Sequence, residues 1–226
     1  MCKETDFNQR VYPFTQDTSY YIWEDGDGTR HYLKYKSSGT YEDELIPGLI
    51  LTTTGSGETK YCLTDKSGNK SYFTDGGYLV QISNNQATAS NISVSYDGVK
   101  LYRVRDGIGR TYIFSYNTDG YLSKIAFLGT GTTELAAETF TYSGGNLVSI
   151  QSALSGAATF GYTSNHLLST ATDAQGYQVR YTYNTVGANQ PNRVTGVAEY
   201  HNDTAGGTLA IEAVSYTHLR AHETRS

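Results

Sequence analysis

The sequence predicts an all-β protein, an open and twisted antiparallel sheet of stacked β-hairpins. Three observations favour this class. The 226 residues include 21 tyrosines, and pleated sheets favour aromatic and β-branched residues. Short segments alternate apolar and polar residues with the two-residue period of a strand. Asp-Gly and related turn sequences, which supply the positive φ of a tight hairpin, separate these segments.

A repeated unit is clearest where three aromatic residues, Tyr112, Phe114 and Tyr116, occupy alternate positions before the turn sequence Asn-Thr-Asp-Gly at 117–120. Because side chains alternate along a strand, we expect these aromatic residues to share one face, opposite the residues between them. Similar units recur over residues 90–197. Each repeat of roughly 20 residues should therefore contribute two strands.

The tyrosines of these strands are the candidate ligand-binding or structural residues of the chain. They are Tyr96, Tyr112, Tyr116, Tyr142, Tyr162 and Tyr183. Their rings can form cross-strand aromatic pairs that hold consecutive hairpins together, which is the role that we favour. The rings can also stack against sugars, because each ring offers an apolar face with a polar tip.

The spacing and composition divide the chain into segments. Residues 1–59 are expected to form an irregular β lead-in, and residues 60–90 a first degenerate repeat with a boundary loop. Residues 91–213 hold the regular hairpin repeats.

Residues 214–226 break the composition of the repeats abruptly. Their sequence resembles the translation of a transposon-end sequencing adapter. We therefore expect a non-native tail there. His218 and His222 are discarded as a metal site, although their i, i+4 spacing would suit one.

Charge and composition exclude several classes of partner. The formal net charge is −5, and the 17 lysines and arginines are scattered along the chain. This pattern argues against nucleic acid as a partner. No apolar run approaches the roughly 18 to 20 residues of a membrane span, and no signal peptide is visible.

Candidate chemistry is sparse. The Asp-Gly-Asp-Gly sequence at 25–28 resembles the start of a calcium loop, but basic residues stand where that loop needs its glycine and glutamate, so a hairpin turn is favoured. His31, His166 and His201 lie in separate hairpins with no cysteine or carboxylate at ligand spacing. We predict no catalytic residue, no cofactor and no metal site.

The recurring Tyr-Asp or Tyr-Asn, Gly-x-Leu-x-x-Ile and Asp-x-x-Gly elements resemble those of the Rhs and YD-repeat family. Tyr96 and Asp97 match the name-giving dipeptide, and the resemblance covers residues 60–200. It implies a sheet that spirals into a hollow shell, which in many members encloses a C-terminal toxin. The Pro-containing, Asp-rich motif at which family members cleave themselves does not occur here.

From these observations we consider three functions, in order of preference. The first is a structural shell segment of a secreted or cell-surface bacterial protein, whose partner is the C-terminal toxin or effector of the parent. The alternative is a surface module that binds carbohydrate or another partner through a Tyr-rich sheet face. An enzyme ranks third, because a regular array of this composition encodes no cleft of converging titratable groups.

Overall fold

A computed structural model describes residues 7–53, 57–85, 91–184, 192–201 and 208–214 of the chain. Within these ranges it contains nineteen β-strands, a short 3₁₀ helix (η2, Gly57–Thr59) and no α-helix. The strands belong to two compact units. Residues 1–115 and 126–135 form the first unit, and residues 116–125 and 136–226 form the second.

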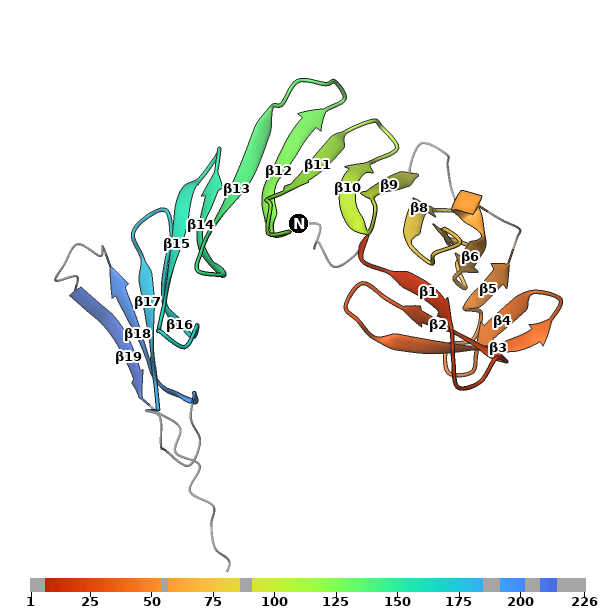
Figure 1. The fold of residues 1–226 in the computed structure, drawn as a ribbon, viewed down its shortest axis with the longest axis horizontal. Coiled ribbons are helices and arrows are strands. Elements are labelled where there is room, and N and C mark those ends of the chain that lie inside the picture. Colours follow the sequence, from red (N-terminus) through yellow and green to blue (C-terminus); the bar gives the residue numbers. More distant parts are fainter. Residues whose placement is uncertain (1–6, 54–56, 86–90, 185–191, 202–207, 215–226) are drawn as a thin grey trace, which may run out of the picture. The chain divides into compact units, whose positions relative to one another are not determined.

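The first unit is a run of consecutive hairpins (Figure 1). Each of its strands pairs antiparallel with the next one along the chain. Its strands are β1 (Arg10–Pro13), β2 (Tyr20–Glu24), β3 (Arg30–Ser37), β4 (Thr40–Asp43), β5 (Ile50–Thr53), β6 (Tyr61–Thr64), β7 (Lys70–Phe73), β8 (Leu79–Ser83), β9 (Ile92–Asp97), β10 (Lys100–Arg105) and β11 (Thr111–Tyr116), whose last residue belongs to the second unit.

One apolar core stabilises the first unit. Its largest fully buried side chains come from five different strands, so the packing joins hairpins that are distant in sequence. They are Val11, Leu33, Leu51, Phe73 and Leu79. Burying side chains of this size contributes about 1.5 to 3 kcal/mol each.

The first strand returns to the turn between β7 and β8. The Val11 amide donates to the Gly77 carbonyl at 3.0 Å, and the Arg10 guanidinium lies 4.4 Å from the centre of the Tyr78 ring. Residues about 65 positions apart are therefore joined through a backbone hydrogen bond.

The second unit repeats the hairpin pattern without a comparable core. Its strands are β13 (Ala136–Ser143), β14 (Asn146–Ser152), β15 (Gly156–Tyr162), β16 (Leu168–Thr172), β17 (Gln178–Tyr183), β18 (Val194–His201) and β19 (Thr208–Val214), while β12 (Leu122–Gly129) contributes residues to both units. Each strand from β13 to β19 pairs antiparallel with the next. Among the side chains described in this unit, no hydrophobic residue is fully buried. Its stability must therefore come from strand ladders and contacts between neighbouring repeats.

The same turn recurs at four Asp-x-x-Gly sequences within the described residues. In each case one aspartate oxygen, Oδ1, accepts the amides two and four residues later, and the amide of the glycine donates to the aspartate carbonyl. The glycines have φ between 83° and 91°, a region that other residues rarely adopt. The aspartates are Asp25, Asp65, Asp106 and Asp173. The hairpin turn predicted at 25–28 is thus confirmed.

These turns predict a stability loss in acid. The side-chain hydrogen bond from Asn69, 2.7 Å long, lowers the pKa of Asp65 below its model-peptide value of 3.8. A carboxylate whose pKa is lower in the folded than in the unfolded state stabilises the fold at pH values above the unfolded-state pKa. This stabilisation is lost as the pH falls below 3.8. Urea unfolding at pH values between 5 and 2 measures this effect. We expect the free energy of unfolding of Asp65→Asn to decline less with falling pH than that of the wild-type protein. Asp119 is exposed and has no hydrogen bond to a described residue, so Asp119→Asn should leave the decline in the free energy of unfolding unchanged.

Several predictions from the sequence can be compared directly with the strands. The all-β class and the antiparallel hairpins are confirmed. In β11, Thr111 and Phe114 are buried whereas Tyr112 is 43% exposed, so burial does not follow the expected alternation, and the shared face of the three aromatic residues stays a prediction. Val214 is the last residue of β19, and the rest of the predicted tail lies outside the described residues. No described helix has the length and apolar character to cross a membrane.

Candidate functional site

Two of the predicted tyrosines join one hairpin repeat to the preceding one. The Tyr162 hydroxyl on β15 donates to the Leu147 carbonyl on β14 at 2.8 Å, and the Tyr183 hydroxyl on β17 donates to the Leu168 carbonyl on β16 at 2.6 Å. Both bonds span 15 residues, so the same contact recurs in successive repeats. We call these two contacts the tyrosine bridges.

Three of the other predicted tyrosines make separate aromatic contacts. Tyr142 stacks on Tyr121 with ring centres 4.9 Å apart, Tyr112 packs against Phe127 at 5.0 Å, and Tyr96 packs against Tyr78 at 5.3 Å. The Tyr96 hydroxyl also donates to the Phe7 carbonyl, whereas Tyr116 is half-buried at the end of β11. Tyr96, Tyr112 and Tyr142 are thus held in individual packing contacts, and a role in stacking against sugars stays a prediction.

The tyrosine bridges predict a specific loss of stability. Tyr183→Phe removes one hydroxyl and leaves the Leu168 carbonyl without its side-chain donor, so we expect the free energy of unfolding to fall by about 0.5 to 1.5 kcal/mol. Tyr181→Phe is the matched control, because Tyr181 lies on the same strand and its hydroxyl has no hydrogen bond to a described residue. Urea unfolding followed by circular dichroism measures both. Equal stability of the two variants would contradict the bridge.

His31 corrects one expectation from the sequence. It does have carboxylate neighbours: its Nε2 lies 3.2 Å from Asp25 Oδ2, and its Nδ1 lies 3.8 Å from Asp43 Oδ2. The ring also stacks on Trp23 at 4.6 Å and is 16% exposed. The two aspartates come from the β2–β3 turn and from β4, so spacing along the sequence could not reveal the cluster. Asp43 also accepts the amides of the loop after β4 through its other oxygen, which indicates a structural role.

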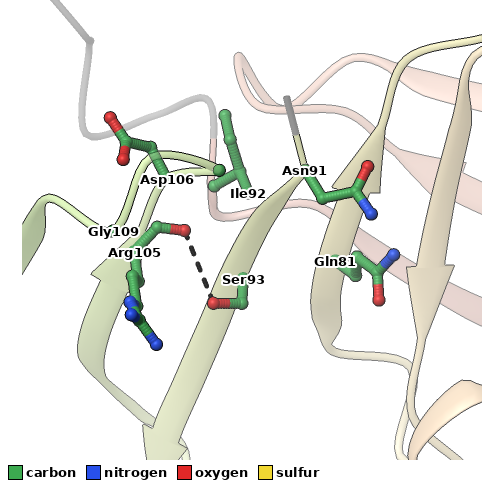
Figure 2. Close-up of a pocket in the computed structure, with 8 residues that line it drawn as sticks. Gln81, Asn91, Ile92, Ser93, Arg105, Asp106 and Gly109 are labelled. Atoms are coloured by element: carbon green, nitrogen blue, oxygen red, sulfur yellow. Dashed lines mark hydrogen bonds between the residues drawn. The ribbon is translucent and has the colours of Figure 1, made fainter. Parts of the chain in front are cut away.

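A polar depression of about 310 Å³ lies beside the turn between β10 and β11 (Figure 2). Three of its residues, Gln81, Ser93 and Arg105, form one cross-strand row over β8, β9 and β10. Registered residues of an antiparallel sheet point to the same face, so these side chains stand next to one another. The alternate residues Val94 and Val104 on β9 and β10 are buried, which places the row on the face away from the core.

The turn at the edge of this depression carries its own ion pair. Burial alone would raise the pKa of Asp106, but the hydrogen bonds from Arg110 outweigh it and lower the pKa overall. The Arg110 Nε to Asp106 Oδ2 distance is 2.6 Å. The Arg105 guanidinium lies beside Gly109, on the other side of the same turn.

Sequence reasoning missed this cross-strand row, because its residues come from three strands and belong to no motif. The alternation of polar and apolar residues, combined with the hairpin register, is the signal that could have found it. Within the described ranges, no three His, Cys, Asp or Glu side chains form a group suited to a metal ion.

Solved structures with a similar fold include two of TcdB2-TccC3. A crystal structure of TcdB2-TccC3 without its hypervariable C-terminal region matches with a TM-score of 0.51 and 14% identity, covering 89% of this chain and 14% of that chain. A crystal structure of TcdB2-TccC3 matches with a TM-score of 0.51 and 16% identity, covering 89% of this chain and 13% of that one.

This likeness, at low sequence identity, shows the fold. No family model matches the sequence, and no curated protein matches it. The chain spans about one seventh of the length of the two chains that it resembles. The hairpin array described above is therefore of the kind found in a segment of TcdB2-TccC3.

Proposed function

We propose that the chain is a structural segment of an Rhs or YD-repeat shell. In a secreted or cell-surface parent protein, this segment forms part of the wall that encases or presents a C-terminal effector region. The chain's partner is that region of the same polypeptide.

The tyrosine bridges carry this proposal. Each bridge joins a hairpin to the preceding one, and the donor is the tyrosine that recurs in every repeat of the sequence. Such contacts allow repeats without a core of their own to be added one after another, as in other repeat proteins. The fold similarity to TcdB2-TccC3 supports the same function.

The regularity of the array also favours an architectural role over catalysis. Two aspartates, Asp25 and Asp43, lie beside His31. Both carboxylates accept hydrogen bonds from the amides of a turn or a loop. Tyr142 packs against another ring, and Tyr162 donates to a backbone carbonyl. These side chains are thus engaged in holding hairpins together.

Protease protection of the intact gene product tests the proposed function. We expect the region that follows the hairpin array to resist trypsin in the wild-type protein and to become sensitive when Tyr162→Phe and Tyr183→Phe are combined. The same region expressed alone should be cleaved readily. Tyr181→Phe should keep the protection. Equal cleavage of the downstream region with and without the array would contradict the shell function.

A further inference from the structure

We infer that the polar depression beside the β10–β11 turn binds an acidic saccharide, a sugar that carries a carboxylate. The site lies within the first unit and does not depend on the proposed shell function. Its central residues are the cross-strand row of Gln81, Ser93 and Arg105 (Figure 2).

Arg105 provides the charge that would select a carboxylate. Its side chain is exposed, and no acidic side chain in the described part of the chain forms an ion pair with it. The neighbouring Asp106 instead pairs with Arg110. A guanidinium presents two parallel N–H donors that match the two oxygens of a carboxylate, and such charge-assisted bonds are about twice as strong as neutral ones.

The neighbouring side chains suit sugar hydroxyls. Gln81 and Asn91 contribute amides, and neither amide makes a side-chain hydrogen bond to another described residue. The Ser93 hydroxyl donates weakly to the Arg105 carbonyl at 3.4 Å, and its oxygen can still accept. Amides both donate and accept, as sugar hydroxyls do, so these side chains can bind a neighbouring pair of hydroxyls on one ring.

An aromatic ring extends the row on its other side. Tyr72 on β7 is registered with Gln81, so both side chains point to the same face of the sheet. The Tyr72 ring is half-buried and can pack against the apolar face of a sugar ring. The row from Tyr72 to Arg105 crosses four neighbouring strands, a length of about 14 Å that suits two or three linked sugars.

The net charge of the protein does not attract anions. The formal net charge is −5, which weakens any general attraction for an acidic ligand. Binding of an acidic sugar must therefore come from local contacts with Arg105 and its neighbours. A volume of about 310 Å³ is at the small end of ligand pockets, so one sugar ring fills the depression while the next lies toward Tyr72.

Titration of the full chain with a trisaccharide of galacturonic acid, at low ionic strength and followed by NMR, tests this site. We expect saturable binding that Arg105→Gln weakens at least about tenfold, as the loss of a charge-assisted bidentate contact implies. Arg103→Gln is the matched control, because Arg103 is exposed, lies two residues away on the same strand and face, and carries the same charge. It should change affinity less than about twofold.

Trp23 fluorescence confirms that both variants remain folded, since this is the single tryptophan of the chain and lies in the first unit. Three results would overturn the inference: no saturable binding by the wild-type chain, equal weakening by the two arginine variants, or equally tight binding of a neutral galactose trisaccharide. Equally tight binding of a tripeptide of glutamate would contradict the assignment to a sugar and indicate a site for acidic peptides.

Discussion

Phe73→Ala should lower the free energy of unfolding of the first unit by about 3 to 5 kcal/mol. Phe73 is 0% exposed and pairs with Tyr61 on one side and Leu79 on the other, in a core that joins several hairpins. Removing its ring leaves a cavity that the surrounding strands cannot close without breaking their ladders. Urea unfolding followed by Trp23 fluorescence measures this loss, because Trp23 reports on the first unit.

The matched substitution in the second unit is Phe160→Ala. Phe160 is half-buried on β15, so less apolar surface returns to water, and we expect a loss of about 1 to 2 kcal/mol. The urea concentration at the midpoint of unfolding, followed by Trp23 fluorescence, should be the same in this variant as in the wild-type protein. A loss in Phe160→Ala as large as that in Phe73→Ala would refute the distinction between a unit with a core and a unit without one.

Gly77→Ala should cost about 2 to 4 kcal/mol, since two penalties combine at this position. The backbone of Gly77 has φ of 78°, and an added Cβ would collide with the Val11 carbonyl oxygen. Relief of the collision requires β1 to move away, which breaks the bond from the Val11 amide to the Gly77 carbonyl. Thermal unfolding followed by Trp23 fluorescence measures this loss, because β1 pairs directly with the strand that carries Trp23.

Gly98→Ala separates the two penalties. Gly98 has φ of 61° in the turn between β9 and β10, and an added Cβ there meets no atom within 4 Å. We expect this variant to lose only about 1 to 2 kcal/mol, the conformational penalty alone. If both glycine variants lost the same amount, the contact between β1 and the β7–β8 turn would have no energetic role.

The hairpins could be predicted from the sequence because their signals are local. Alternation over Tyr112, Ile113 and Phe114 and the Asp-x-x-Gly turns involve residues fewer than six positions apart, and the structure has strands and turns there. The Ala-Ala-Glu segment at 136–138 consists of helix-forming residues, and it lies in β13 because strand pairing with β14 prevails over local propensity.

The contacts between distant residues could not be predicted, because they depend on how far the sheet curls within the first unit. Nothing in the composition around Gly77 indicates that β1 returns to it, 66 residues away along the chain. The carboxylates about His31 come from a turn and from the next hairpin, and their approach follows from the register of β3 with β4. The cross-strand row of Gln81, Ser93 and Arg105 likewise requires three strand registers to be known together.

Cross-strand nuclear Overhauser effects in the second unit test the central claim, that successive repeats pair in hairpin order. We expect contacts that connect Ile150 with Ala158, Phe160 with Ala171, and Ala171 with Val179, because these residues are directly registered on β14 to β17. The Tyr183 hydroxyl group should also lie close to Leu168. Contacts shifted by one residue along these strands, or a parallel pattern between any two of them, would contradict the account.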